Sequence, residues 1–79
     1  MQRFPRDAPK DRVINTLKKL SFEIAREGNH IAMIRKNKDG TLTPLTLPNH
    51  NKIKASTLRI ILNQSRISRQ EFLDAFYSK

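Results

Sequence analysis

The chain has 79 residues, no cysteine, and 16 Lys and Arg side chains against 7 Asp and Glu, which gives a formal net charge of +9. This length allows one domain with one modest core, and the lack of cysteine excludes disulfide bonds and thiolate metal sites. The excess of positive charge indicates an anionic partner, of which nucleic acid and anionic membrane are the usual examples.

The first half of the chain predicts a helix followed by three strands. Pro9 lies in the first turn of the expected helix, where its missing N–H costs little, and apolar residues recur at helical spacing after it. Pro44 places the third strand at the edge of the sheet, or points residue 44 outward, because proline lacks a backbone donor. The expected segments are a loosely ordered arm at 1–7, a helix at 9–20, strands at 22–27, 30–36 and 41–47, a turn at 28–29 and a hairpin turn at 37–40.

The second half predicts two helices after a basic, irregular loop at 48–54. Ser56 or Thr57 is expected to cap the first of them. The segment 68–71 fits a capping box that starts the second helix, and Ile67 and Phe72 are placed to form its hydrophobic staple. Helix, three strands, helix and short helix together predict an α+β fold, in which helices cover one face of a three-stranded antiparallel sheet.

No apolar run approaches the roughly 20 residues that span a bilayer, and no helix pairs a basic face with a large apolar one. The N-terminus lacks the apolar core of a signal peptide. We therefore expect a single domain over residues 1–79 that resides in the cytoplasm, without membrane contact. We expect no cofactor and no metal, since the two histidines lack the acidic cluster that a zinc site would need.

The candidate catalyst is His30, which follows a Gly28-Asn29 turn at the start of a strand. His30 and His50 are the side chains that titrate near neutral pH, and no serine or cysteine triad can be assembled. RNA carries its own nucleophile, the 2′-hydroxyl, so one histidine acting as base or acid, together with nearby cations, is sufficient for a slow ribonuclease. The alternative is that His30 is a packed or surface residue without chemistry.

Polar and basic residues around this histidine are candidate RNA contacts. Some lie along the strands beside His30, and others lie before a helix N-terminus, where free N–H groups favour an anion. The alternative for each is an ordinary solvated surface position. Phe4 is too isolated in the sequence to predict a platform for base stacking. The candidate RNA-binding residues are Arg26, Asn29, Arg35, Lys36, His50, Lys52, Lys54 and Ser56.

The order and spacing of several motifs resemble the HicA (YcfA-like) family, the messenger-RNA interferases of bacterial toxin–antitoxin systems. The resemblance covers nearly the whole chain beyond its first residues. The residues that carry it are Phe22, Gly28-Asn29-His30, Asp39-Gly40, Leu45-Thr46-Leu47-Pro48, His50, Lys54, Ser56-Thr57-Leu58-Arg59, Ile61-Leu62, Ile67-Ser68 and Glu71-Phe72.

This resemblance implies a fold similar to a double-stranded-RNA-binding domain, a metal-independent endoribonuclease, and catalysis by the histidine that corresponds to His30. It also implies a HicB-type antitoxin that masks this histidine, and a higher-order complex with it. Three positions depart from the family pattern, and at one of them Ile31 stands where many members have a polar or aromatic residue. Asn29 stands where serine is usual, and Arg66 stands where many members have glycine, which would cost roughly 1–2 kcal/mol if the backbone there is left-handed. The alternative function is a noncatalytic RNA-binding module of the same fold.

Overall fold

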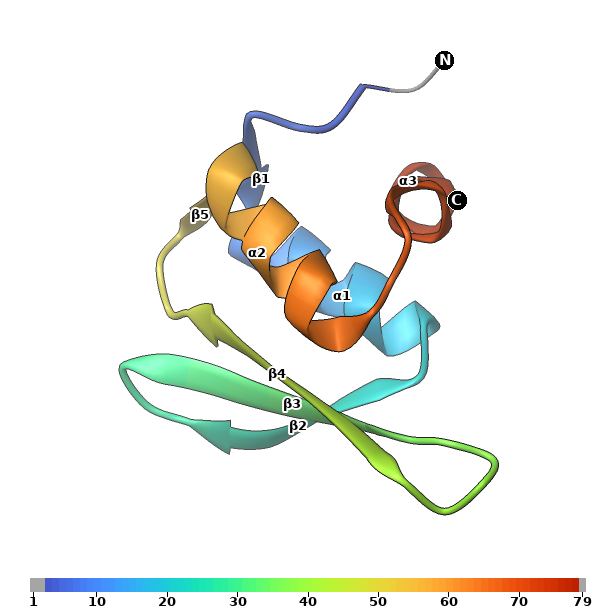
Figure 1. Cartoon of the computed structure of the whole chain (residues 1–79). Coiled ribbons are helices and arrows are strands. Elements are labelled where there is room, and N and C mark those ends of the chain that lie inside the picture. The colour runs from blue at the N-terminus through green and yellow to red at the C-terminus, as the bar shows by residue number, and fades with distance from the viewer. Residues whose placement is uncertain (1–2, 79) are drawn as a thin grey trace.

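The computed structural model describes residues 3–78, and its three longest strands form an antiparallel sheet in the order β2-β3-β4 (Figure 1). Both connections within this sheet are hairpins, as the short turns in the sequence predict. The expected α+β fold with an α-β-β-β-α order is confirmed. The elements are β1 (Asp7–Pro9), α1 (Lys10–Lys19), β2 (Phe22–Glu27), β3 (His30–Lys36), β4 (Leu42–Pro48), β5 (Lys52–Lys54), α2 (Ala55–Ser65) and α3 (Arg69–Tyr77).

The helices lie on one face of the sheet and leave the other face open (Figure 1). Side chains alternate between the two faces along each strand, so every second residue of β3 and β4 enters the core. Ile31 and Met33 of β3 and Leu45 and Leu47 of β4 are each at most 2% exposed. They pack in one cluster with apolar side chains from all three helices, including Phe72 of α3.

A second, two-stranded sheet differs from the sequence prediction. Residues 48–54 were expected to form an irregular loop and residues 1–7 a loose arm, yet β1 pairs with β5 in antiparallel register. Ala8 and Ile53 face each other in this pairing, and both are 1% exposed. The arm is also held before β1, because the Tyr77 hydroxyl donates to the Arg3 carbonyl at 2.9 Å. Burial of two apolar side chains therefore fixes segments that look irregular in the sequence.

The two-stranded sheet also caps the first two helices, which corrects two predicted helix starts. The helix α1 begins at Lys10, after Pro9, and the Lys10 N–H donates to the Asn51 carbonyl at 2.9 Å. The helix α2 begins at Ala55, and its N–H donates to the Arg6 carbonyl at 2.8 Å. Neither Ser56 nor Thr57 is therefore the cap of α2. Backbone carbonyls of the opposite strand segment accept hydrogen bonds from helix N–H groups, a role that a serine or threonine side chain usually fills.

The predicted start of α3 is confirmed. The Glu71 N–H donates to Ser68 Oγ at 3.1 Å, and the Ser68 N–H donates to Glu71 Oε1 at 3.3 Å, which completes a capping box. Two cations of α1 bind the other end of α3, where free carbonyls carry partial negative charge. Arg12 donates to the Phe76 carbonyl at 3.1 Å and stacks on the Phe76 ring, and Lys19 donates to the Ala75 carbonyl at 3.2 Å. Two of the positively charged side chains, Arg12 and Lys19, thus stabilise the fold by binding the end of α3.

The edge position of Pro44 is confirmed, because β4 forms one margin of the three-stranded sheet. Gln64 Nε2 donates to the Thr46 carbonyl at 3.0 Å, so this carbonyl points away from β3. Pro44 and Pro48, two residues to either side, share its orientation and lack N–H groups. The β4 margin therefore offers few donors to another strand. Within residues 3–78 we find no helix with the length and apolar character needed to cross a lipid bilayer.

Candidate active site

His30 is the first residue of β3 and is exposed to solvent. The sequence left open which face of the sheet carries it, because both alternating sets of β3 residues contain apolar side chains. Ile31 and Met33 enter the core, so His30 belongs to the opposite, open face. The imidazole is accessible, as proton exchange with a bound substrate requires.

The turn before His30 is held by Asn49, a residue that the sequence analysis missed. Asn49 Nδ2 donates to the Gly28 carbonyl at 2.9 Å, and the Asn49 N–H donates to the Asn29 carbonyl at 3.2 Å. Lys10 Nζ in turn donates to Asn49 Oδ1 at 2.7 Å. Asn49 therefore connects the turn to the end of β4 and to the start of α1. The strand register places position 49 opposite position 29, which is the signal that would have indicated it.

A small pocket lies at the end of β4, next to the strand position that pairs with His30. His30 and Pro48 are cross-strand partners, so their side chains emerge on the same face at neighbouring positions. Pro48 is one of the residues that line a pocket of about 200 Å³, whereas His30 itself does not line it. In Figure 1 this end of the sheet is at the left, where the turn between β2 and β3 approaches the connection from β4 to β5. The other lining residues are His50, Lys52, Ile53, Lys54 and Thr57.

Four of the predicted contacts thus gather at one end of the sheet. Lys52 and Lys54 flank the buried Ile53 on β5, so both side chains point away from the core. His50 precedes them in the exposed connection from β4. Asn29 is exposed in the turn itself, and its carbonyl accepts the Asn49 bond described above. His50, Lys52 and Lys54 thus place one imidazole and two ammonium groups around one small pocket.

Arg26 reaches the face of His30 because of an irregularity in β2. The register shifts between Ile24 and Arg26, so that Ile24 pairs with Met33 and Arg26 pairs with Ala32. Without this bulge Arg26 would share the inner face with Ile24, because alternate residues of a strand point the same way. With it, Arg26 is a diagonal neighbour of His30 on the open face.

The other three predicted contacts lie elsewhere. Lys36 is on the open face, but six residues along β3 separate it from His30, which is about 20 Å. Arg35 is on the helix-covered side, where its guanidinium lies 4.9 Å from the Phe22 ring centroid and its Nε donates to Asn37 Oδ1. Ser56 is exposed in the first turn of α2, between Lys54 and Thr57, so it adjoins the pocket without lining it. The structure therefore does not bring Lys36 and Arg35 together with His30.

Three acidic residues lie on the strands that build the site. Asp7 pairs with Lys54 in the two-stranded sheet, Glu23 lies on the open face opposite Ile34, and Glu27 ends β2 beside the turn. Asp39 lies in the hairpin at the far end of the sheet, where hydrogen bonds from the Thr41 side chain and backbone lower the pKa of its carboxyl. Within residues 3–78 no three His, Asp or Glu side chains lie close enough together to hold a metal ion.

Comparison with known proteins gives one match. The family model described as HicA toxin of bacterial toxin-antitoxin matches residues 11–67, which is more than half of the chain. The matched segment runs from α1 through the whole three-stranded sheet and α2 to two residues before α3, so it includes His30 and the residues that line the pocket at the end of β4. No curated protein matches the chain, and no solved structure matches it.

Proposed function

The chain belongs to the HicA family of toxins from bacterial toxin–antitoxin systems, and on this premise we propose that it is an endoribonuclease that uses His30 to cleave messenger RNA. Toxins of this family are generally ribonucleases. The observation that carries the assignment of the site is the exposed His30 on a braced turn, whose cross-strand partner Pro48 lines a pocket together with His50, Lys52 and Lys54.

In the proposed reaction the 2′-hydroxyl of the substrate attacks the adjacent phosphorus. His30 removes the 2′-hydroxyl proton as a general base, or protonates the departing 5′-oxygen as a general acid. The P–O5′ bond breaks as the O2′–P bond forms, which leaves a 2′,3′-cyclic phosphate and a free 5′-hydroxyl. Lys52 and Lys54 stabilise the charge that develops on the phosphoryl oxygens. No metal takes part in this scheme.

The remaining polar residues of the site have binding roles in this proposal. Arg26 extends the cationic surface across the open face, and Asn29 and His50 contact phosphate or ribose next to the scissile bond. Lys36 and Arg35 lie farther away and would contact only more distant parts of a long RNA, whereas Ser56 adjoins the pocket without lining it. The protein would act in the cytoplasm, where translated RNA is found.

A toxin of this family requires an antitoxin, and we propose a HicB-type protein that covers the open face. That face carries His30 together with Leu42, which is 56% exposed, and the half-buried Ala32 and Ile34. Apolar side chains on the same face as a catalytic imidazole suit a protein inhibitor, because a partner that covers the whole face hides the catalyst at the same time. Binding of several such pairs would give a higher-order complex.

The substitution His30→Ala tests the assignment. We expect it to lower the rate of RNA cleavage by at least about 10²-fold, while the affinity for RNA and the thermal unfolding temperature stay close to those of the parent. Expression of the parent, but not of the variant, should arrest bacterial growth, and co-expression of the antitoxin should relieve the arrest. A parent that binds RNA without producing a 2′,3′-cyclic phosphate would instead identify a noncatalytic RNA-binding module.

A further inference from the structure

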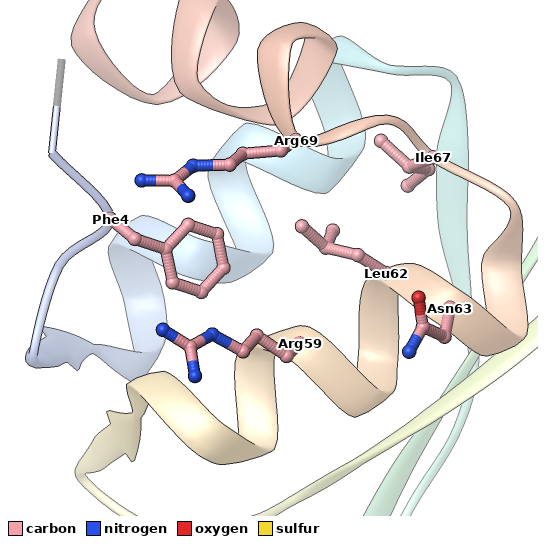
Figure 2. A pocket seen from close by; sticks show the side chains of 6 residues that line it. All are labelled: Phe4, Arg59, Leu62, Asn63, Ile67 and Arg69. Atoms are coloured by element: carbon pink, nitrogen blue, oxygen red, sulfur yellow. The ribbon is translucent and has the colours of Figure 1, made fainter. Parts of the chain in front are cut away.

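A second pocket lies away from the sheet, among the N-terminal segment, α2 and α3. It has a volume of about 230 Å³ and is lined by Phe4, Arg59, Leu62, Asn63, Ile67 and Arg69. Figure 2 shows the Phe4 ring between the guanidinium groups of Arg59 and Arg69, with Leu62 and Ile67 forming a wall farther in. Drug-sized ligands occupy pockets of roughly 300–1,000 Å³, so this one suits a single small group.

The two arginines are held in place by the aromatic ring. The guanidinium carbon of Arg69 lies 5.5 Å from the Phe4 ring centroid and that of Arg59 lies 5.9 Å from it, both within the range of a cation–π interaction. Phe4 itself is fixed, because its ring centroid lies 6.1 Å from that of the buried Phe72. Less side-chain entropy is therefore lost when either guanidinium binds a ligand.

The charge of this pocket is not balanced. No carboxylate lines it, so two positive groups share one small space. A guanidinium presents a planar fork of N–H donors that matches a phosphate group and binds it through two hydrogen bonds. The apolar wall and the ring edge complement a flat, uncharged group next to that phosphate. Asn63 at the rim offers both a donor and an acceptor, as the edge of a nucleobase requires.

Arg59 lies on the helix that follows the cationic residues of the candidate active site. Lys54 immediately precedes α2, and Arg59 lies five residues farther along the chain, which is about 8 Å along the helix axis. The two pockets share no lining residue. An RNA strand that passes from Lys54 around α2 would bring a later nucleotide to Arg59, whereas a short acidic protein segment would gain from the two arginines alone.

We propose that this pocket binds one nucleotide of single-stranded RNA, at a distance from the cleaved bond. Its phosphate accepts hydrogen bonds from the guanidinium groups of Arg59 and Arg69 on the solvent side of the Phe4 ring, and its base lies against the edge of that ring, Leu62 and Ile67. Stacking of bases on aromatic and guanidinium groups is a common mode of binding single strands. The inference rests on the proposed function for the identity of the polyanion, and it assigns a subsite outside the residues that act on the scissile phosphate.

The test uses the full chain carrying His30→Ala, so that RNA is bound without being cut. The probe is a fluorescein-labelled oligouridylate of about 12 nucleotides, long enough to cover both sites, and its anisotropy gives Kd over a range of salt concentrations. Arg59→Ala and Arg69→Ala should each weaken binding at least about fivefold and lower the slope of log Kd against log salt by about 0.7. Lys18→Ala, which removes an exposed charge of α1, is the matched control and should leave both values near those of the parent.

Conservative variants distinguish the planar donor geometry of arginine from its positive charge. Arg59→Lys and Arg69→Lys keep the positive charge but lose the planar donors, so we expect weaker binding with an unchanged salt slope. Phe4→Leu removes the aromatic ring while leaving both guanidiniums, and it should weaken binding without altering the slope. Thermal unfolding of each variant, followed by circular dichroism, identifies any loss that comes from unfolding.

Two outcomes would overturn the inference. In the first, the arginine variants and Lys18→Ala weaken RNA binding equally, which would make the effect one of net charge alone. In the second, the arginine variants bind RNA normally but lose affinity for an oligoglutamate peptide, which would make an acidic protein segment the occupant. Cleavage of the same RNA by the parent chain is scored separately. Loss of binding in the arginine variants without cleavage by the parent would refute the proposed function and leave the pocket assignment standing.

Discussion

Asn49 connects the turn that carries His30 to both neighbouring elements. Its amide group donates to the Gly28 carbonyl and accepts from Lys10, and its N–H donates to the Asn29 carbonyl. Asn49 is assigned no proton transfer, so its influence on the reaction would pass through the position of the imidazole. A misplacement of about 1 Å at a reacting group can cost about 10²-fold in rate, and a braced turn prevents such a shift.

We predict that Asn49→Ala lowers kcat for RNA cleavage by about tenfold, because the side-chain hydrogen bond to the Gly28 carbonyl, worth about 0.5–1.5 kcal/mol, is lost together with the contact from Lys10. KM should change little, and the unfolding temperature should fall by no more than about 10 °C. The control is Asn51→Ala, which removes an exposed side chain of the same type two residues away and keeps the backbone carbonyl that caps α1. Equal kcat values for the two variants would refute a positioning role for Asn49.

Among the secondary-structure elements, α2 ends in a strained conformation. Arg66 follows the helix with φ 57° and ψ 31°, in the left-handed region that favours glycine. The left-handed backbone at Arg66 confirms the expectation drawn from the sequence, because many members of the family have glycine at this position. The cost to a residue with a side chain is roughly 1–2 kcal/mol, partly offset because glycine would gain more entropy in the unfolded chain.

We therefore expect Arg66→Gly to raise the free energy of unfolding by about 1 kcal/mol. Urea denaturation followed by circular dichroism measures the change. Arg66→Ala removes the same side chain but keeps a Cβ atom, so it should remain close to the parent. If glycine and alanine give the same stability, the end of α2 is not strained.

The elements that could be predicted from the sequence are those with a local signal. The apolar spacing of α1, the run of Ile and Met in β3 and the capping box at Ser68 each lie within one short segment. The β1/β5 pairing has no such signal, because it joins Ala8 to Ile53 across 45 residues and uses strands of three residues. The predicted cap at Ser56 or Thr57 was wrong for the same reason. The cap is a backbone carbonyl from a segment distant in sequence.

The candidate site also has a part that the sequence predicted and a part that it did not. His30 and the basic residues around it were identified from residue type and local motif. Their grouping was not, because it depends on the bulge that turns Arg26 outward and on the pairing that holds Lys52 and Lys54. Asn49 was missed because its role is structural and appears only when β3 and β4 are in register. Phe4, isolated in the sequence, lies between two arginines once the chain is folded.

The whole molecule depends on one core, to which every helix contributes. Phe72 of α3 is fully buried, with its ring centroid 5.5 Å from that of Phe76. A domain of this size has a free energy of unfolding of about 4–12 kcal/mol. Truncation of a buried phenylalanine costs about 3–5 kcal/mol, which is a large share of that total.

We predict that Phe72→Ala leaves much of the protein unfolded at 37 °C and abolishes RNA cleavage, although α3 lies outside the proposed catalytic site. Ile60→Ala is the control, since Ile60 is 64% exposed and its truncation should change stability by less than about 0.5 kcal/mol. Thermal unfolding of both variants checks the prediction. Retention of full activity and stability in Phe72→Ala would mean that α3 is dispensable to the fold.

The two-stranded sheet of β1 and β5 has a practical consequence for anyone preparing this protein. Each of its strands leads directly into a helix, and each strand segment supplies the carbonyl that caps the helix beginning at the other. A purification tag that disturbs residues 6–9, or a shortened version that lacks them, would release Lys52 and Lys54 from their scaffold. Weak nuclease activity measured on such a sample would reflect the disturbed N-terminal segment and not a defect of His30.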